Sequence, residues 1–335
     1  MKNKIFNKLL LGIFILLSLL FFLSGCGKHM ETSMHQTKTD RLSIVCTSFP
    51  QYDWTRNILG ERSAEIDLIL LNTKGADLHS FQPTAQNMVQ IANCNLFIYV
   101  GGFSESWVDA ALQSSQNPKL MSLPLLDFVN KKEEIFTEGI LIKEDEHDHE
   151  EDAHEIEYDE HIWLSLNCAQ DACSAIKDAL CQLDPQNSKI YEENLNTYLK
   201  QLQNLDAHYR KTVENAPYRT LLFTDRFPFL YLAEDYGLTY FAAFPGCSAE
   251  SEASFDTVIF LSEKLKELKL PAVCLTESGD FSFAETVINN AESENVQVQT
   301  INSMQFVTSK NINEGATYLS IMEENLQALS SALGL

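Results

Sequence analysis

The chain is poor in basic residues for its length. It has 24 lysine and arginine side chains against 47 aspartate and glutamate side chains in 335 residues, so its formal net charge is −23 at pH 7. Nucleic acid is densely negative and is held mainly by basic residues, so this deficit argues against nucleic acid as a partner. An acidic surface suits a protein that collects cations, but it suits plain solubility equally well.

The cysteines show none of the spacings that are typical of zinc ribbons. Cys168 and Cys173 are five residues apart on a segment expected to be helical, too far round the helix for an easy disulfide. A free cysteine within an apolar run behaves as a small hydrophobic residue. Such cysteines are Cys46, Cys94 and Cys274. We therefore expect most cysteines after Cys26 to be buried thiols, and their pairing stays open.

The N-terminus has the features of an export signal. Three lysines among the first eight residues precede an apolar run over residues 9–23, which is followed by Ser24, Gly25 and Cys26. The run is rather short to cross a bilayer, which takes about 20 apolar residues, and lipoprotein processing modifies a cysteine in this position. We predict a signal peptide over 1–25 and a lipidated Cys26, not a retained transmembrane anchor. The polar residues of 26–40 are expected to form a flexible tether.

The rest of the chain alternates short apolar runs with helical patterns. In the first half, strands are expected at 42–47, 66–71 and 96–100, and helices at 54–59 and 84–92. After Pro217, strands are expected at 220–224, 240–244, 272–276 and 296–301. This rhythm predicts an α/β protein with two Rossmann-like lobes.

A long charged stretch separates the two halves. From Ser188 to about Asn215, apolar and aromatic residues recur at helical spacing, and no glycine or proline interrupts them. We therefore expect a single long helix within 186–216. It would join an N-terminal lobe at 41–185 to a C-terminal lobe at 217–335, with a cleft between the lobes.

The segment from Glu144 to Glu160 contains no lysine or arginine at all. It is rich in aspartate and glutamate and also carries His147, His149 and His154. Such a block cannot bury its charges, so we expect a solvated loop within the N-terminal lobe. Two interpretations stay open. The loop is either a solubilising acidic insertion or a low-affinity metal-collecting loop, because clustered imidazoles bind zinc and copper.

Several side chains that bind metals in proteins follow expected strands. His79 comes after the strand at 66–71, and Glu277 directly follows the strand at 272–276, with Asp280 three residues on. His161 comes just after the acidic loop. In open α/β sheets, ligands bind beyond the carboxyl ends of the strands. Two imidazoles and a carboxylate form a set suited to zinc or manganese, although each residue alone is a weak signal.

Three segments of this chain resemble the cluster A-I solute-binding proteins of zinc and manganese ABC importers. They are residues 75–83, 161–164 and 318–326. The likeness covers nearly the whole mature chain, including the lipobox, Trp107 and the long helix. It implies metal ligands at His79, His161 and Glu277. In the manganese-type arrangement, Asp280 would supply the carboxylate in place of Glu277. The acidic loop with its histidines resembles the zinc-specific branch.

The resemblance implies a receptor function. The protein would be a monomer, lipid-anchored at the outer face of the cell membrane, that binds Zn²⁺, or alternatively Mn²⁺, and delivers it to an ABC transporter permease and its ATPase. It would not be an enzyme. A zinc metalloenzyme and a surface adhesin are the alternatives. The chain has no His-Glu-x-x-His motif, and neither His79 nor His161 has a second histidine four residues on, which argues against the enzyme.

Binding through imidazoles has two further consequences. The second ring N–H of each ligand histidine needs an acceptor that fixes its tautomer, and Asp77 and Asp159 are local candidates. Because imidazoles bind protons near neutral pH, metal binding is expected to weaken below about pH 6.

The resemblance fails at one ligand. Family members carry a third histidine, or a glutamate, after the first strand of the C-terminal lobe, where this chain has Arg226. A guanidinium stays protonated and offers no lone pair, so Arg226 cannot bind a cation. Three outcomes stay open. Asp225 replaces the missing ligand, Cys247 or Glu250 reaches the cleft from its own loop, or water completes the site while Arg226 pairs with an acidic neighbour.

Overall fold

The computed structural model describes residues 41–115, 117–134, 157–247 and 253–335. The expected signal peptide and tether lie outside these ranges, as do Cys26, His147, His149, His154 and Glu250. Residues Leu42–Leu335 form one compact unit. Within the described ranges, we find no helix with the length and apolar character that crossing a membrane requires.

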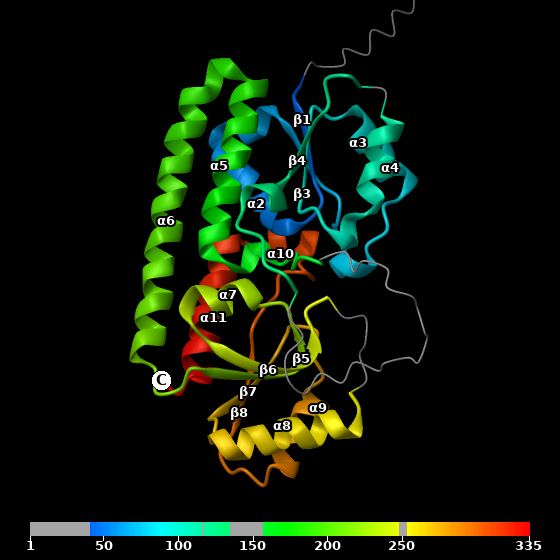
Figure 1. The fold of residues 1–335 in the computed structure, drawn as a ribbon. Coiled ribbons are helices and arrows are strands. Elements are labelled where there is room, and N and C mark those ends of the chain that lie inside the picture. Colours follow the sequence, from blue (N-terminus) through cyan, green and yellow to red (C-terminus); the bar gives the residue numbers. More distant parts are fainter. Residues whose placement is uncertain (1–40, 116, 135–156, 248–252) are drawn as a thin grey trace, which may run out of the picture. The chain divides into compact units, whose positions relative to one another are not determined.

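The first lobe is built on a parallel sheet of four strands. They are β1 (Ser43–Cys46), β2 (Asp67–Leu70), β3 (Leu96–Tyr99) and β4 (Met121–Pro124), in the spatial order β2-β1-β3-β4. Helices α2 (Phe49–Leu59), α3 (Ala85–Asn93) and α4 (Trp107–Ser114) each follow one of the first three strands (Figure 1). The predicted strands are confirmed, and β4 is an additional one. Helix α2 begins earlier than predicted because Pro50 fits the first turn of a helix.

The second lobe repeats this plan. Its strands are β5 (Thr220–Phe227), β6 (Thr239–Pro245), β7 (Ala272–Leu275) and β8 (Gln297–Thr300), in the spatial order β6-β5-β7-β8. Its helices include α7 (Leu230–Tyr236), α8 (Phe255–Leu268) and α9 (Phe281–Asn290). All four predicted strands are confirmed. Strand β5 runs beyond its predicted end, and its register with β6 is irregular between Phe223 and Arg226.

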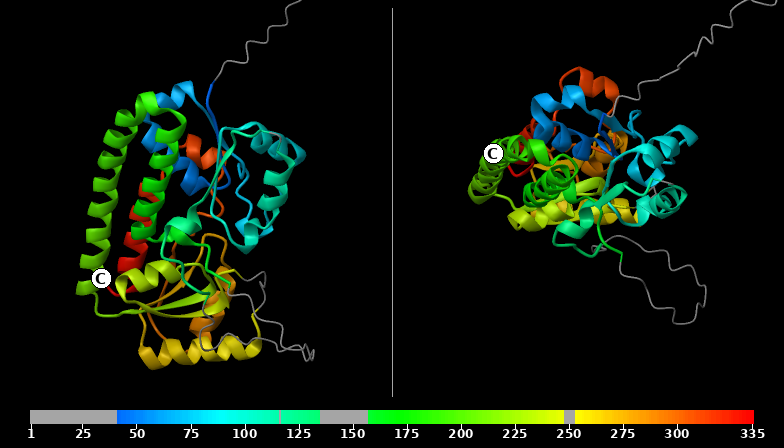
Figure 2. Two further views of the ribbon diagram at one scale, coloured as in Figure 1. Left: turned by 45° about the horizontal axis from the view of Figure 1, so that its top comes forward. Right: turned by 90° about the horizontal axis from the view of Figure 1, so that it is seen from above.

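The long helix predicted from the sequence is α6 (Ser188–Asn215), which packs against α5 (Leu166–Leu183) and α2. Helices α5 and α6 lie side by side in both views of Figure 2. The buried face of α6 is formed by Tyr191, Leu195, Tyr198, Leu202, Leu205, Tyr209 and Val213. The apolar spacing therefore predicted the helix.

The C-terminal helix α11 (Tyr318–Ala332) also connects the two lobes. It packs against α6, β7 and β8, and against α2 of the first lobe. The backbone N–H of Tyr318 donates to the buried Asp53 carboxylate at 3.0 Å, and the Tyr209 hydroxyl donates to the carbonyl of Met322 at 2.6 Å. The lobes are thus held by α11 as well as by α6.

Loops that follow strands of both sheets meet in a cleft between the lobes. The cleft holds about 680 Å³ and is lined by Asp77 and His79 from the first lobe and by Asp225, Arg226 and Asp280 from the second, among others. This arrangement confirms the interlobe cleft predicted from the sequence, because the carboxyl ends of parallel strands are where such sheets bind ligands.

The seven cysteines of the described ranges are all free thiols. Five of them are buried, namely Cys46, Cys94, Cys168, Cys173 and Cys274. Cys181 and Cys247 are partly exposed. The prediction of mostly buried thiols is confirmed.

Candidate metal centre

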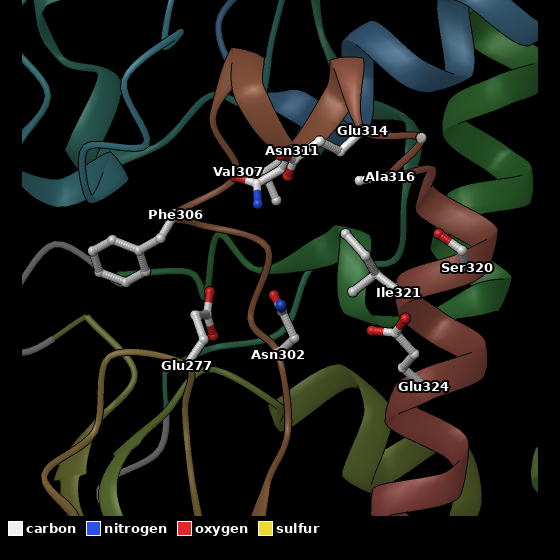
Figure 3. A pocket seen from close by; sticks show the side chains of 11 residues that line it. Glu277, Asn302, Phe306, Val307, Asn311, Glu314, Ala316, Ser320, Ile321 and Glu324 are labelled. Atoms are coloured by element: carbon white, nitrogen blue, oxygen red, sulfur yellow. The ribbon is translucent and has the colours of Figure 1, made fainter.

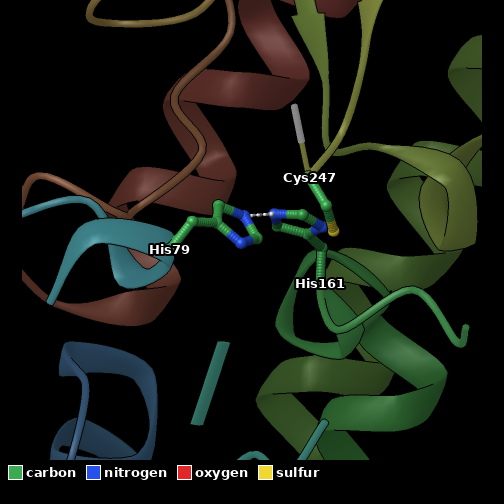
Figure 4. Close-up of side chains that lie close together, drawn as sticks. All are labelled: His79, His161 and Cys247. Carbon is green, nitrogen blue, oxygen red and sulfur yellow. Dashed lines mark hydrogen bonds between the residues drawn. The ribbon is translucent and has the colours of Figure 1, made fainter. Parts of the chain in front are cut away.

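His79 is fixed by the loop that follows β2. It lies in a short 3-10 helix, η2 (Leu78–Ser80), and its backbone N–H donates to the Asp77 carboxylate at 3.0 Å. Its ring atom Nδ1 lies 2.5 Å from the hydroxyl oxygen of Ser104. Because Nδ1 is engaged, Nε2 is the ring atom that faces His161 (Figure 4). The sequence led us to expect Asp77 as the partner of this ring, but the partner is Ser104.

His161 is fully buried in the connection from β4 to α5. Its backbone N–H donates to Asp159 at 2.7 Å, and its Nδ1 lies 3.1 Å from the same carboxylate oxygen. The prediction that Asp159 holds this ring is confirmed. Its Nε2 lies 3.4 Å from Nε2 of His79 and 3.1 Å from the amide nitrogen of Gln305.

Cys247 is the third candidate ligand at this place. It lies on the turn after β6, and its sulfur, one ring nitrogen of His79 and one ring nitrogen of His161 all lie within 4.8 Å of one another (Figure 4). The preceding Gly246 allows the close approach, because an added Cβ would lie 2.9 Å from the carbonyl oxygen of Phe227 and 3.4 Å from the His161 ring. Three segments far apart in the sequence thus bring two nitrogens and one sulfur together.

The electrostatics of the cluster separate the two imidazoles. Burial lowers the pKa of His79 to about 4, and the charges of His161 and Arg226 act in the same direction. Burial also disfavours the charged form of His161, but Asp159 outweighs it, so the pKa of His161 is raised. Burial raises the pKa of the Cys247 thiol. As the pH falls, His161 therefore binds a proton before His79 does, and a metal ion competes with that proton and with the thiol proton.

Arg226 pairs with an acidic neighbour, one of the outcomes left open by the sequence. Its Nη2 lies 2.6 Å from the Asp77 carboxylate. The adjacent Asp225 does not turn toward the histidines, because its carboxylate accepts hydrogen bonds from the backbone and hydroxyl of Thr276. Asp280 accepts from the backbone N–H of Ser282 at the start of α9.

Glu277 lies in a different environment from the cluster. Its carboxylate accepts from the backbone N–H of Ser303 at 2.6 Å and from the Ser303 hydroxyl at 2.9 Å. It lines a second cleft of about 640 Å³ together with Asn302 and Glu324 (Figure 3). Among the residues that the structure describes, the clustered ligand atoms do not include this carboxylate. Its role as a metal ligand stays a prediction.

Three residues near the cluster were not predicted from the sequence. Ser104 and Gln305 contact the two imidazoles, and Glu134 accepts from the backbone N–H of Cys247 at 3.0 Å. Ser104 follows a Gly-Gly pair after β3, which was a usable signal for a loop at a strand end. Glu134 ends a run of charged residues and has no pattern of its own.

Comparison with known proteins gives consistent matches. The family model described as ZnuA, zinc-uptake complex component A periplasmic, matches residues 44–332. Zinc-binding lipoprotein AdcA of Streptococcus pneumoniae is 28% identical over 311 residues, covering 92% of this chain but only 60% of AdcA. High-affinity zinc uptake system protein ZnuA of Bacillus subtilis is 28% identical over 330 residues, covering 96% of this chain and 97% of that protein.

Solved structures agree with these matches. The Zn(II)-bound ZnuA-like domain of S. pneumoniae AdcA aligns with a TM-score of 0.68 at 26% identity, covering 88% of this chain and 100% of that domain. The metal-dependent lipoprotein YcdH of B. subtilis aligns with a TM-score of 0.71 at 25% identity, covering 88% of this chain and 100% of YcdH.

Proposed function

This chain belongs to the periplasmic zinc-uptake complex component A family, and we propose that it is the metal receptor of an ABC importer, which binds Zn²⁺ through His79, His161 and Cys247. It acts as a monomer at the outer face of the cell membrane, held there by a lipid on Cys26. It passes the ion to the importer's permease, whose partner ATPase drives uptake, and it is not an enzyme. The relatives named as zinc-binding or zinc-uptake proteins support this role.

The spacing of the two imidazoles carries the proposal. Their Nε2 atoms lie 3.4 Å apart. Two nitrogens bound to one tetrahedral zinc at about 2.0–2.1 Å are separated by about 3.3 Å. The rings are therefore already spaced for a single ion, because Ser104 and Asp159 hold them from behind. A zinc–sulfur bond of about 2.3 Å then requires at most a small inward movement of the Cys247 turn.

The sulfur also favours one metal over the other. Thiolates are soft ligands and select zinc, whereas carboxylates and water suit manganese. Replacing a third imidazole by Cys247 therefore keeps the site a zinc site, with Mn²⁺ as the alternative ion of lower affinity. The neutral His79, whose pKa burial lowers to about 4, offers its lone pair to the ion without first losing a proton.

The fourth coordination position has two candidates, Glu277 and water. Glu277 reaches the ion only by giving up its hydrogen bonds to Ser303. If Glu277 binds the ion, Glu277→Gln costs as much zinc affinity as loss of an imidazole. A change of less than about tenfold, the lower bound for loss of an outer-shell partner, assigns the position to water.

Calorimetric titration of the metal-stripped protein with Zn²⁺ and Mn²⁺ tests the site. His79→Ala, His161→Ala and Cys247→Ser should each lower zinc affinity by more than the roughly 10–100-fold that loss of an outer-shell partner costs. Cys181→Ser is the matched control, because Cys181 is also partly exposed but lies outside the cluster. Tight zinc binding that survives both histidine substitutions would show that the cleft is not the site.

A further inference from the structure

The turn that carries Cys247 has a polar anchor. The backbone N–H of Cys247 donates to Oε1 of Glu134 at 3.0 Å. Glu134 belongs to the connection from β4 to α5, which also carries His161, whereas Cys247 follows β6 of the second lobe. This hydrogen bond therefore ties the segment that supplies the sulfur to the segment that supplies one of the imidazoles. Hydrogen bonds to a carboxylate are stronger than bonds between neutral groups.

Glu134 is itself held in place by its backbone. Its N–H donates to the carbonyl of Glu157 at 3.0 Å, and the neighbouring Glu133 forms an antiparallel bridge with Tyr158. The N–H of Asp159 donates in turn to the carbonyl of Lys132 at 2.9 Å. These contacts fasten Glu134 to the strand-like segment that ends two residues before His161.

One buried tyrosine forms hydrogen bonds to both of the paired segments. The hydroxyl of Tyr231 accepts from the N–H of Lys132 at 3.2 Å and donates to the carbonyl of Asp159 at 2.8 Å. Tyr231 lies on α7 and is fully buried. The carboxylate of Glu134 therefore projects from a well-supported backbone, whereas Cys247 lies on a partly exposed turn.

We propose that Glu134 is a positioning residue of the metal site, which holds the Cys247 backbone so that its sulfur reaches the ion bound by His79 and His161. This inference rests on the proposed function and assigns Glu134 no bond to the metal. Because the thiolate is the ligand that favours zinc over manganese, loss of Glu134 should lower zinc affinity much more than manganese affinity. Glu134 thereby contributes to the choice of metal.

Titration with Co²⁺ gives a readout specific for the sulfur. A bound thiolate adds a sulfur-to-cobalt charge-transfer absorption that imidazoles do not produce. In Glu134→Ala this absorption should fall strongly, and zinc affinity should drop about 10–100-fold, as for other outer-shell partners of metal ligands. Glu134→Gln should retain most of both signals, because its amide oxygen still accepts from the Cys247 N–H.

Two further variants separate positioning from general damage. Glu134→Asp keeps the charge but shortens the reach, so it should behave like Glu134→Ala while its thermal unfolding stays close to that of the unmodified protein. Glu133→Ala is the matched control, because Glu133 is exposed on the same bridge, and it should leave the charge-transfer absorption unchanged.

A double-substitution cycle completes the test. If Glu134 acts only through Cys247, adding Glu134→Ala to Cys247→Ser should cause no further loss of zinc affinity. Additive losses, or a normal charge-transfer absorption in Glu134→Ala, would overturn the inference while leaving the proposed function intact. Failure of the unmodified protein to bind Co²⁺ or Zn²⁺ would instead remove the proposed function itself.

Discussion

Arg226 forms an ion pair with Asp77 across the cleft, with Nη2 and Oδ2 2.6 Å apart. The side chains are only 16% and 14% exposed. The second oxygen of the same aspartate accepts from the backbone N–H of His79. Arg226 of the second lobe therefore supports a candidate ligand of the first lobe, at the position where the family resemblance led us to expect a metal ligand.

Removing this ion pair should weaken both the fold and the site. In Arg226→Met, the mostly buried Asp77 carboxylate loses its ion pair with Arg226. This loss should lower the free energy of unfolding by about 1.5–3 kcal/mol and reduce zinc affinity. Chemical denaturation of the metal-stripped protein and calorimetry measure the two effects. Arg210→Met is a suitable control, since Arg210 is more exposed and pairs with Asp206 on the same helix. An unchanged zinc affinity in Arg226→Met would refute the link to His79.

A histidine at position 226 should be able to replace Cys247 as a zinc ligand. Cys247→Ser is expected to lose most zinc affinity, and adding Arg226→His should recover much of it, because position 226 would again offer a neutral nitrogen. The cobalt complex of the double variant should lack the sulfur charge-transfer absorption. If Arg226→His gives no recovery, then position 226 does not face the ion in this chain.

As the pH is lowered, zinc binding should begin to weaken at a higher pH than it would with histidines of ordinary pKa. The folded protein holds the His161 proton more tightly than an ordinary imidazole of pKa about 6.5 does, because Asp159 raises the pKa of His161. Zinc must displace this proton, so affinity is lost as pH falls through that raised value. Asp159→Asn removes the charge and should shift the loss of binding to lower pH. A pH series of zinc titrations measures the shift, and an unmoved profile would contradict this account.

Asp53 should stabilise the fold without affecting the metal. Its side chain is fully buried and accepts from the Tyr318 N–H at 3.0 Å, and it pairs with Arg56. Asp53→Ala leaves the buried Tyr318 N–H without an acceptor, while Arg56 is 33% exposed and can be hydrated, so the free energy of unfolding should fall by about 1–3 kcal/mol. Thermal unfolding measures this loss against Asp109→Ala, an exposed position on α4. At temperatures where the variant is folded, its zinc affinity should match that of the unmodified protein.

Most helices and strands could be predicted from the sequence, but the contacts between loops that form the candidate site could be predicted only in part. Helix α6 was predictable because its apolar residues repeat without interruption, whereas β4 has no continuous apolar run and ends in a proline. His79 stood out because it follows a predicted strand, and His161 because it follows the acidic loop within a segment that resembles the family. Choosing Cys247 over Asp225 required knowing which loops meet, since that depends on packing between residues far apart in the chain.

The free thiols make the proposed metal site sensitive to oxidation. In its described ranges the chain has seven unpaired cysteines, and the proposed zinc site uses one of them, Cys247. Disulfides form readily in oxidising extracytoplasmic compartments, and thiolates are oxidised in steps that destroy their ability to bind metals. Oxidation of the partly exposed Cys247 would remove the sulfur from the proposed site, whereas five of the other thiols are buried and shielded from oxidants.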